Sequence, residues 1–379
     1  MTGPSPATRI LGGREGGGVP VSRPGLPPLE EFVQRLEGVW ASAWLTNNGP
    51  CVQELERALA HELQVPHVVL VANGTLALQL AIRALGFRDS VVTTAFSFVA
   101  TASSLVWEGC RPIFVDVEPD YFTIDPAAVD AAIGPETRGI LATHVYGNPC
   151  DVEALEKIAT KHGVPILYDA AHTFGATYRG RPVAAFGDAA TLSFHATKIF
   201  HTVEGGAVVT ADPNLAEGVR RQRAFGEARP TEYQQVGINA KLSEVHAAMG
   251  LCLLPRVPEF IAARKAVAEA YDRGLASAGA LVTRPRIRPG TTWNYAYYPV
   301  LLQDGEAVHR VQERLRREKV DSRRYFYPSL SDLPYVTANT TPVSRTAADR
   351  ALCLPLWAGL ETSRAEAIAG LVLEALTPG

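Results

Sequence analysis

The stretch HVVLVANGTLALQLAIRALG, residues 67–86, places an apolar strand directly before an amphipathic helix. Its first six residues form the continuous β-branched and apolar run that is typical of a strand covered on both faces. Asn73 or Thr75 can cap the helix that follows, and Gly86 suits its C-terminal end. A strand joined to a helix in this way is the repeating unit of an α/β fold.

Short apolar runs and helical segments continue to alternate from about Leu29 to Leu251. Strands that are linked by helices form a mostly parallel sheet, whose ligand sites lie at the carboxyl ends of the strands. We therefore predict an α/β fold in which helices flank a mostly parallel sheet. The further predicted strands cover residues 90–96, 111–117, 139–147, 164–170, 188–194 and 206–212.

The composition changes after about residue 250, which divides the chain into domains. The later elements are a long helical segment at 255–279, a strand at 294–302, a charged helix at 308–320 and a last helix near Ala365–Leu376. We predict a flexible, Gly/Pro-rich lead-in over residues 1–25, a large domain over 26–250 and a smaller α+β domain over 251–379.

The overall composition is that of an ordinary globular protein. Hydrophobic residues make up 47% of the chain, and 36 basic against 39 acidic side chains give a net charge of −3. This charge does not favour a nucleic acid or an anionic membrane as a partner. The five cysteines are scattered, as in a protein with reduced thiols rather than disulfides or a zinc site. Because no apolar leader or membrane-spanning run is present, we expect a cytoplasmic protein.

Two common cofactor-binding motifs can be set aside. The sequence contains no G-x-x-x-x-G-K-[ST] phosphate loop. The early run GGREGGG, residues 12–18, follows no predicted strand and opens no predicted helix, so it is not a dinucleotide fingerprint. The remaining candidates for chemistry are polar side chains at the predicted strand ends.

Three such positions carry groups that suit a single cofactor. Ala72–Thr75 lies at a helix N-terminus, where free N–H groups favour a phosphate. Asp169 ends an apolar strand, and Lys198 follows the next strand. Alone, the helix start is more often a plain cap and the lysine a solvated loop residue, and an aspartate at a strand end is about as often a turn or cap residue. Together they describe pyridoxal phosphate, with the helix start on the phosphate, the carboxylate on the pyridine nitrogen and the lysine on the aldehyde. Such a lysine must be partly neutral, which requires burial or nearby positive charge.

The order of several motifs resembles the DegT/DnrJ/EryC1/StrS family of sugar aminotransferases, which are fold-type I pyridoxal phosphate enzymes. The resemblance runs from about Thr46 to the C-terminus, and its most specific block is SFHATKIFHTVEGGA, residues 193–207. The other matching segments are NGT, TTAFSFVATA, HVYGNPCD, YDAAHTFGATYRG and GINAKLSEVHAAMGL. The resemblance implies a fold-type I architecture, pyridoxal 5'-phosphate as the cofactor and aminotransferase activity.

The resemblance also implies a role for each matching residue. Lys198 and Asp169 would be the catalytic pair, with Lys198 on the aldehyde of the cofactor and Asp169 on its pyridine nitrogen. The other implied cofactor contacts are Phe98 on the ring, His172 on the ring hydroxyl, and Gly74, Thr75 and Ser193 on the phosphate. Asn239 would reach the phosphate in the neighbouring subunit, which implies a homodimer with shared active sites.

Simpler explanations remain open for several of these residues. Phe98 would be a core residue, the commoner fate of a strand phenylalanine, and His172 an ordinary loop histidine. Asn239 would cap the helix that we predict to begin near Leu242. One position departs from the family pattern, because His201 stands where the resemblance predicts an asparagine. The role of His201 is therefore unassigned.

Basic and aromatic residues are interleaved in two C-terminal segments, TTWNYAYYPVLL and VDSRRYFYPSLSDLPY. Such groups can hold a diphosphate and stack on a nucleotide base, although each could also be a surface arginine or a core aromatic. The predicted substrate contacts are Arg323, Arg324, Tyr325, Tyr327 and Tyr295, with Trp293, Asn294 and Tyr297 as further candidates. Within the resemblance, an RRYFYP segment is typical of enzymes that aminate C4 of dTDP-4-keto-6-deoxyglucose.

We therefore expect a transaminase that moves an amino group from an amino acid, glutamate by the resemblance, to C4 of a dTDP-4-keto-6-deoxy-hexose. Its product would serve amino-sugar biosynthesis, either for secondary-metabolite glycosylation, as in antibiotics, or for a surface polysaccharide. The alternatives are a C3 ketosugar aminotransferase and a pyridoxal-phosphate-binding regulatory protein of the same fold. A related sugar 3-dehydratase would carry histidine in place of Lys198. We expect no nucleic acid, membrane or metal as a partner.

Overall fold

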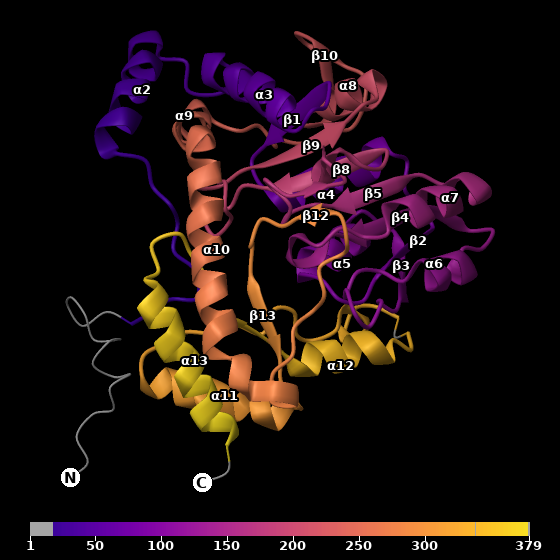
Figure 1. The fold of residues 1–379 in the computed structure, drawn as a ribbon. Helices are drawn as coiled ribbons and strands as arrows, with labels where there is room; N and C mark the ends of the chain where they lie inside the picture. Colours follow the sequence, from indigo (N-terminus) through magenta and orange to yellow (C-terminus); the bar gives the residue numbers. More distant parts are fainter. Residues whose placement is uncertain (1–17, 338, 378–379) are drawn as a thin grey trace.

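A seven-stranded sheet with the order β1-β9-β8-β5-β4-β2-β3 forms the centre of the molecule (Figure 1). The computed structural model describes residues 18–337 and 339–377. The strands of this sheet are β1 (His67–Val71), β2 (Ser90–Thr94), β3 (Arg111–Val115), β4 (Thr137–Thr143), β5 (Ile166–Asp169), β8 (Ala189–Ser193) and β9 (Gly206–Thr210). Neighbours pair in parallel except for β9, which is antiparallel to both β1 and β8. The predicted strands and the mostly parallel sheet are confirmed.

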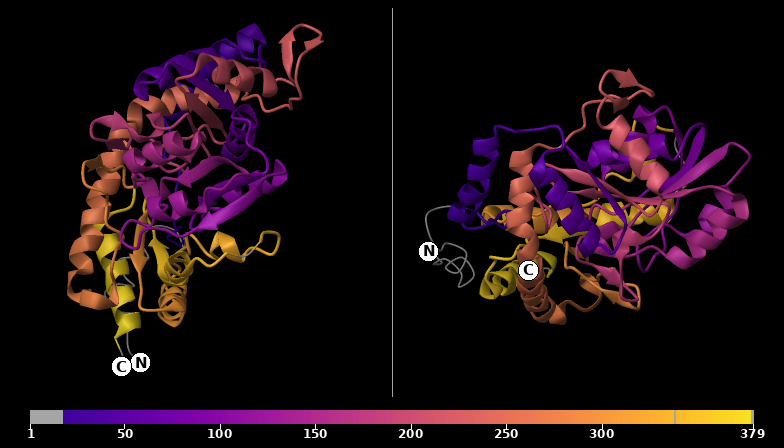
Figure 2. Two further views of the ribbon diagram at one scale, coloured as in Figure 1. Left: turned by 90° about the vertical axis from the view of Figure 1, so that its right-hand side faces the viewer. Right: turned by 90° about the horizontal axis from the view of Figure 1, so that it is seen from above.

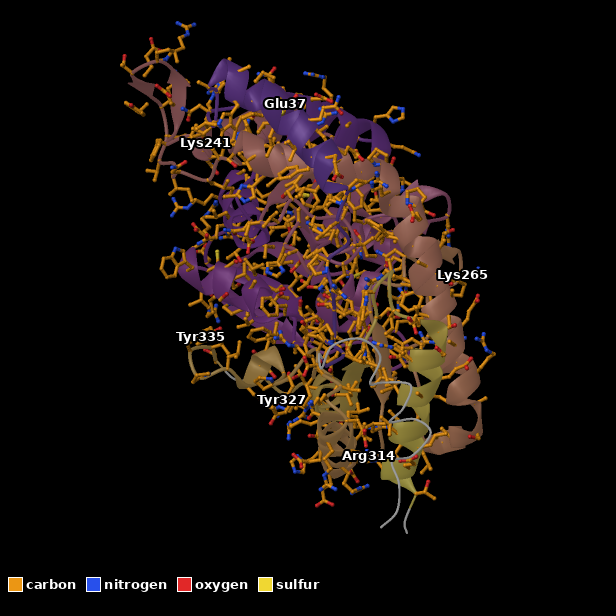
Figure 3. The ribbon with its side chains drawn as sticks, turned by 90° about the vertical axis from the view of Figure 1, so that its left-hand side faces the viewer. Glu37, Lys241, Lys265, Arg314, Tyr327 and Tyr335 are labelled. Carbon is orange, nitrogen blue, oxygen red and sulfur yellow. The ribbon has the colours of Figure 1, made fainter. Side chains whose placement is uncertain are left out.

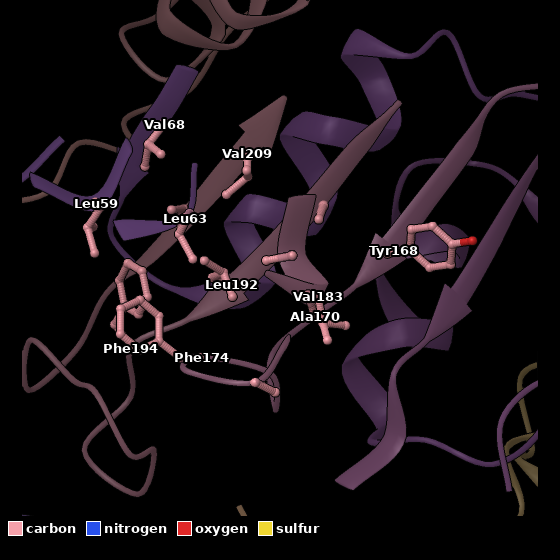
Figure 4. Close-up of a cluster of buried hydrophobic side chains, with 14 of the residues drawn as sticks. Leu59, Leu63, Val68, Tyr168, Ala170, Phe174, Val183, Leu192, Phe194 and Val209 are labelled. Carbon is pink, nitrogen blue, oxygen red and sulfur yellow. The ribbon is translucent and has the colours of Figure 1, made fainter. Parts of the chain in front are cut away.

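Strand β1 shows why helices cover both faces of the sheet. Its side chains Val68 and Leu70 belong to the apolar cluster on one face, and Val69 and Val71 belong to the cluster on the other. Because successive side chains point to opposite faces, an unbroken apolar run supplies both layers. The first layer contains α3 (Pro50–Glu62), α6 (Pro126–Ala132) and α7 (Val152–His162), and the second contains α4 (Gly74–Ala84), α5 (Val99–Trp107) and α8 (Pro213–Gln222). Figure 2 shows these layers from two further directions, and Figure 4 shows part of the first cluster.

Helix α4 begins and ends at signals that are visible in the sequence. The Asn73 side chain accepts a hydrogen bond from the Leu76 N–H at 2.9 Å, so Asn73 is the cap. After the helix, Gly86 has a φ of +70°, a left-handed conformation that glycine adopts without a Cβ clash. The carboxyl end of β1 and the N-terminus of α4 are therefore joined by a two-residue turn at a fixed place on the sheet.

The C-terminal part packs helices around a separate apolar core and a two-stranded antiparallel sheet. Its elements are α10 (Val257–Gly274), α11 (Gly305–Arg317), α12 (Pro342–Arg350), α13 (Thr362–Leu376), β13 (Tyr298–Leu301) and β14 (Ala351–Leu354). Helices α10 and α13 lie side by side along the left of Figure 1. This is the predicted smaller α+β unit, and its last helix begins a little earlier than predicted. The domain boundary at residue 250 stays a prediction.

The remaining elements connect these two parts or extend from them. They are α2 (Leu29–Ser42), α9 (Glu244–Leu253), β6 (Thr177–Tyr178), β7 (Arg181–Pro182), β10 (Glu227–Arg229), β11 (Glu232–Tyr233), β12 (Thr291–Thr292) and the 3-10 turns η1 (Val145–Gly147), η2 (Val183–Ala185), η3 (Leu254–Arg256), η4 (Ala276–Leu281) and η5 (Leu330–Asp332). Strand β12 pairs with β6, so the segment that enters the small domain is tied to the large one. The β10–β11 hairpin projects from the top of the molecule in Figure 1.

One helical run, Glu244–Gly274, is long and apolar enough by composition to cross a membrane. Of its most apolar window, 44% is buried inside the fold, and a buried core helix can pass the same test of length and composition. This run contains α9, whose Ala247, Ala248 and Leu251 are buried. Its apolar composition is therefore weak evidence for a membrane span.

The segment before α2 differs from the sequence prediction. Val19, only 2% exposed, pairs with Val320: its N–H donates to Lys319 O and its carbonyl accepts from the Asp321 N–H, both at 2.8 Å. Further on, the Leu356 N–H donates to the Val21 carbonyl at 3.1 Å. The expectation of a flexible lead-in is therefore wrong for residues 18–25, because a short strand-like pairing holds them to the small domain. The rest of the predicted lead-in, residues 1–17, lies outside the described residues.

Candidate active site

The loop between β8 and β9 carries Lys198 and is closed by backbone contacts. The Phe194 N–H donates to the Gly205 carbonyl at 2.8 Å, and the Thr202 N–H donates to the Phe194 carbonyl at 2.9 Å. Gly206 lies against the start of α4, since a Cβ there would be 2.6 Å from the Asn73 carbonyl. The glycine is therefore required by close packing.

The N-terminus of α4 meets the end of β8 at the centre of the site. A Cβ on Gly74 would lie 2.8 Å from the Cβ of Ser193, so only glycine allows this approach. The first turn of a helix leaves N–H groups unbonded within the helix, and here the Ser193 hydroxyl lies beside them. Thr75, the next residue, is exposed. The three predicted phosphate contacts of this subunit therefore come together.

Asp169 is the last residue of β5 and is buried. Thr101 Oγ1 donates to Asp169 Oδ2 at 2.7 Å, and the Ala171 N–H donates to Oδ1 at 3.2 Å. Burial raises the pKa of the Asp169 carboxyl, while these two hydrogen bonds and the charge of Lys198 oppose the rise. The site thus contains a buried carboxylate that a further positive group would stabilise.

The amine of Lys198 lies in a partly buried position in front of the strand ends. Its Nζ donates a hydrogen bond to Tyr297 Oη at 3.1 Å. Burial lowers the pKa of the Lys198 amine to about 8, and the negative charge of Asp169 opposes this shift. The solvated-loop alternative is therefore wrong for Lys198, and its amine is neutral to a useful extent near neutral pH.

His172 is buried and is held in one tautomer by the backbone. Its Nδ1 accepts a hydrogen bond from the Tyr146 N–H at 3.2 Å, which leaves Nε2 to carry the proton. Burial lowers the pKa of His172 well below its ordinary value, and the positive charge of Lys198 adds to this effect. The ring stacks on Phe326 with centroids 5.4 Å apart. His172 is thus a fixed neutral hydrogen-bond donor.

An aromatic wall from both domains closes the site. Phe326 lies 6.0 Å from Phe96 and 6.4 Å from Phe98, and Tyr297 lies 5.8 Å from Tyr146, measured between ring centroids. Phe98 is 52% exposed, so the core alternative is wrong for this residue. A large apolar ring that is left open beside a polar site suits stacking on a flat ligand.

The predicted substrate contacts divide into two groups. Tyr325 packs edge-on against Tyr297 with centroids 5.3 Å apart, and Arg323 donates to Tyr325 Oη at 3.3 Å while remaining exposed. Arg324 instead donates to the Asp349 carbonyl at 2.9 Å and lies over the Tyr327 ring at 3.5 Å. Tyr327 is on the outer rim of the molecule, in the lower part of Figure 3. The structure therefore brings Arg323 and Tyr325 toward the lysine and engages Arg324 and Tyr327 elsewhere.

The segment from Trp293 to Tyr297 has a supporting role that the sequence did not indicate. Asn294 is buried, and its Nδ2 donates to the carbonyls of His172 at 2.8 Å and Phe174 at 2.9 Å. Tyr295 packs on Trp293, and its carbonyl accepts from Arg264 Nε at 2.8 Å. Both hydrogens of the Asn294 amide are therefore used, and the prediction that Asn294 contacts the substrate is wrong. The interactions of Tyr295 give no support to its predicted substrate contact.

The structure bears on two residues left open by the sequence, Asn239 and His201. Helix α9 begins at Glu244 with Ser243 as its cap, so Asn239 is not a helix cap, and its side chain is exposed. His201 is buried, its Nε2 donates to the Gly25 carbonyl at 2.8 Å, and its Nδ1 accepts from the Val203 N–H at 3.2 Å. His201 thus holds the N-terminal segment against the loop that carries Lys198.

Several residues near the lysine and the carboxylate were missed by the sequence reasoning. Tyr146 and Phe326 gave no signal, since their roles depend on two distant segments meeting. Ser97 and Thr101 did give one, because they are four residues apart in TTAFSFVATA and their hydroxyls lie 2.8 Å apart, but that segment drew attention only to Phe98. Among the described residues, no group of three or more His, Cys, Asp or Glu side chains is placed to hold a metal ion.

The groups that meet here fit pyridoxal phosphate. The glycine-permitted contact between Gly74 and Ser193 forms a cradle at a helix N-terminus, which suits a phosphate. The buried Asp169 suits a protonated pyridine nitrogen, and the partly neutral Lys198 suits an aldehyde. The exposed ring of Phe98 suits a flat heterocycle. Each chemical group of the cofactor therefore has a matching partner.

Comparisons with known proteins agree with this arrangement. The profile of the DegT/DnrJ/EryC1/StrS aminotransferase family matches residues 29–373. A dTDP-4-amino-4,6-dideoxy-D-glucose transaminase of Escherichia coli is 38% identical over 94% of this chain and 98% of its own length. A UDP-2-acetamido-2-deoxy-3-oxo-D-glucuronate aminotransferase of Pseudomonas aeruginosa is 34% identical over 83% of this chain and 88% of its own length. The crystal structure of DesI with its TDP-sugar product superposes with a TM-score of 0.91 at 35% identity, covering 96% of this chain and 94% of that one.

Proposed function

The chain belongs to the DegT/DnrJ/EryC1/StrS aminotransferase family, and we propose that it transfers an amino group from glutamate to C4 of a dTDP-4-keto-6-deoxy-hexose. It is an aminotransferase that depends on pyridoxal 5'-phosphate and acts in amino-sugar biosynthesis. The observation that carries the C4 assignment is the near full-length similarity to the transaminase from Escherichia coli, whose name places the amine at C4. The similarity to DesI, whose structure holds a TDP-sugar product, supports a dTDP-linked substrate.

We assign the cofactor contacts from the site. Gly74, Thr75 and Ser193 would hold the phosphate, Phe98 would stack on the ring, and His172 Nε2 would donate to the ring hydroxyl. Asp169 would face the pyridine nitrogen. Asn239 of the partner subunit would complete the phosphate site. The Asn239 side chain is exposed in the single chain, so it is free to make this contact, which supports the proposed homodimer. We also propose a cytoplasmic location.

Bound pyridoxal phosphate supplies an electron-withdrawing ring that accepts the charge left when a Cα proton is removed. Lys198 Nζ is the proposed base that removes this proton from the amino donor, and it later delivers a proton to C4 of the sugar. With its pKa lowered to about 8, about half of the amine is neutral at pH 8, compared with less than about 1% for an ordinary lysine. Tyr297 Oη, which accepts a hydrogen bond from Nζ, orients the amine between these transfers.

The sugar nucleotide would bind against the small-domain wall. Arg323 carries an exposed guanidinium beside Tyr325, so this pair is our revised proposal for the diphosphate contact. Arg324 already contacts Asp349 and the Tyr327 ring, so Arg324 and Tyr327 are less suited to that contact. A role in antibiotic glycosylation or in a surface polysaccharide is consistent with such a product.

A coupled reaction with two substrates tests the proposal. The purified protein should turn over dTDP-4-keto-6-deoxyglucose with glutamate, and NMR should place the new amine at C4. The same reaction with the 3-keto isomer tests the alternative that the relative from Pseudomonas aeruginosa suggests, since its name describes a 3-oxo sugar. Amination at C3 alone would overturn the C4 assignment, while absence of any turnover with amino donors would count against the proposed reaction. The Lys198→Ala variant serves as the inactive control.

A further inference from the structure

Three hydroxyl side chains form a hydrogen-bonded chain that ends on Asp169. Thr143 Oγ1 donates to Ser97 Oγ at 3.0 Å, Ser97 Oγ lies 2.8 Å from Thr101 Oγ1, and Thr101 Oγ1 donates to Asp169 Oδ2 at 2.7 Å. All four side chains are buried. We call Thr143, Ser97 and Thr101 the hydroxyl relay.

The relay is assembled by the sheet. Thr143 and Asp169 end the adjacent parallel strands β4 and β5, where they are paired in register. Ser97 and Thr101 come from the loop after β2 and from the first turns of α5, which lies over the same strand ends. The positions of the hydroxyls are therefore set by the end of β4, the loop after β2 and the start of α5.

The protons of the relay must all point toward Asp169. An ionised carboxylate can only accept, and each hydroxyl has a single proton. Thr101 gives its proton to Asp169, so it must accept from Ser97. Ser97 then accepts from Thr143, which is the direction that the geometry of that contact gives. A proton on Oδ2 would weaken the acceptor that Thr101 uses, so hydroxyls pointing in this direction favour the ionised carboxylate.

We propose that Thr101, Ser97 and Thr143 are positioning residues that keep Asp169 ionised and hold its carboxylate toward the pyridine nitrogen of the cofactor. This inference rests on the proposed role of Asp169. A buried carboxylate that faces a pyridine is useful only as an anion, since an uncharged acid would leave the nitrogen unprotonated. Aligned hydrogen bonds strengthen one another in a site shielded from water, so the effect of the relay extends beyond Thr101. The other titratable groups facing Asp169 are Lys198 and Tyr297.

The test measures cofactor binding as well as activity. In Thr101→Val, which keeps the shape but removes the donor, we expect the dissociation constant of pyridoxal phosphate to rise about tenfold or more. Thr101→Ser should restore binding to within about twofold, since it keeps the hydroxyl. Ser97→Ala and Thr143→Val should give smaller losses in that order, because they break the relay farther from Asp169. Binding is followed by the near-visible absorbance that develops as the cofactor is added to the apoprotein.

A spectroscopic readout separates this role from simple packing. If the pyridine nitrogen of the cofactor loses its proton, one positive charge disappears near Lys198 Nζ, which would be bonded to the cofactor. Losing that charge raises the pKa of this nitrogen, so the pH midpoint of the near-visible band should move to higher pH in Thr101→Val. In an Asp169→Asn background the Thr101→Val change should have little further effect, because the charge that the relay serves is gone. Thermal unfolding of each variant checks that the fold is intact.

Several results would overturn the inference. One is a Thr101→Val protein with wild-type affinity and an unchanged midpoint, and another is an equal loss in Thr101→Val and Thr101→Ser, which would indicate packing alone. If Thr101→Val does not fold, wild-type binding in both Ser97→Ala and Thr143→Val would overturn it. These failures leave the proposed function standing as long as the wild-type protein binds the cofactor and transaminates the 4-keto sugar.

Discussion

Strands β3 and β5 lie in the same sheet and run in the same direction, yet the aspartates at their ends have different partners. Asp116, directly after β3, accepts hydrogen bonds from the Val343 N–H at 2.8 Å and from the Ser344 N–H and Oγ at 2.7 Å. Asp116 belongs to the large domain, and it thereby caps the N-terminus of helix α12 in the small domain. Asp169, at the end of β5, accepts from Thr101 and faces Lys198.

The difference lies in what the rest of the fold brings to each strand end. The helix N-terminus that lies against β3 supplies three hydrogen-bond donors to Asp116, which therefore links β3 to α12 as a structural latch. At β5 the neighbouring hydroxyls occupy one oxygen of Asp169, and a titratable amine stands nearby. The sequence pattern of an aspartate at a strand end therefore predicts where the carboxylate lies, while its neighbours determine its function.

The largest effect should come from removing the amine in front of Asp169. We expect Lys198→Ala to lower the transamination rate by on the order of 10³-fold or more, because the base that moves the proton is lost. The yellow near-visible band, and its fixation by borohydride, should disappear. Far-UV circular dichroism should remain unchanged. A variant that retained more than a tenth of the wild-type rate would contradict the assignment of Lys198.

Neutralising each strand-end aspartate tests the comparison directly. Asp169→Asn should lower the rate by roughly 10²- to 10³-fold through loss of electrostatic stabilisation, with little change in folding stability. Asp116→Asn should leave the rate unchanged and lower the free energy of unfolding by about 1–2 kcal/mol, because it weakens the cap of α12. Steady-state kinetics and urea unfolding of both variants provide the measurement. If Asp116→Asn lowered the rate and Asp169→Asn lowered only the stability, the assignment of Asp116 as structural and Asp169 as catalytic would be wrong.

Tyr297, which contacts the Lys198 amine in front of β5, should contribute less to the reaction rate than Lys198 or Asp169. Tyr297→Phe removes the hydroxyl that accepts from Lys198 Nζ but keeps the ring, so we expect a loss of about 5- to 30-fold in the rate. Because the amine is less well oriented, the loss should appear in kcat more than in KM. Tyr298→Phe, at the neighbouring position on β13, provides a matched control whose hydroxyl bonds to Asp272 instead. Similar kinetic losses in both variants would argue against an orienting role.

Two adjacent arginines of the small domain, Arg323 and Arg324, allow a substrate contact to be distinguished from a structural contact in the same way. Arg323→Gln should raise the KM for the sugar nucleotide by about tenfold, since an exposed guanidinium beside Tyr325 would be lost. Arg324→Gln should change KM little and lower the free energy of unfolding by about 1 kcal/mol, because its contacts are with Asp349 and the end of α12. Initial rates at varied substrate and urea unfolding separate the two. An increase in KM confined to Arg324→Gln would restore the original prediction for that residue.

The smallest effect is a pH dependence of the apoprotein. The pKa of Lys198 is about 8 in the folded chain and about 10.5 when unfolded, so the unfolded chain binds more protons between these values. The contribution of Lys198 to stability therefore rises with pH from about 8 to about 10.5. We expect the stability of the wild-type apoprotein relative to Lys198→Met to increase over this window in urea unfolding. Parallel pH profiles for the two proteins would show that the amine is not shifted.

Much of the large domain could be predicted because its signals are local. The apolar runs of β1, β5 and β8 and the cap at Asn73 each reflect a requirement of the backbone close by in the sequence. Parallel topology then brings strand ends together, so the start of α4, Asp169 and Lys198 could be grouped in advance, whereas Ser193 was implied by the family resemblance. This is why the sequence located the phosphate cradle, the carboxylate and the amine.

The small-domain wall could not be predicted to the same extent because its partners are far apart in the sequence. Nothing near Arg324 in the sequence indicates that it will contact Asp349, and nothing near Asn294 indicates that its amide will bond to the carbonyls of His172 and Phe174. Side-chain direction in these loops is fixed by contacts between domains rather than by periodicity. The pairing of Val19 with Val320 was missed for the same reason.

The contacts of residues 18–25 set a limit for recombinant versions of this protein. A version trimmed to begin at residue 26 would remove the Val19 pairing and leave His201 without its acceptor at Gly25. An unpaired strand edge at Val320 would then be open to other chains, and a buried imidazole would need a new partner. Affinity tags and cleavage sites are therefore best placed before residue 18, and apparent insolubility of a shorter version would reflect its cloning boundary rather than its catalytic residues.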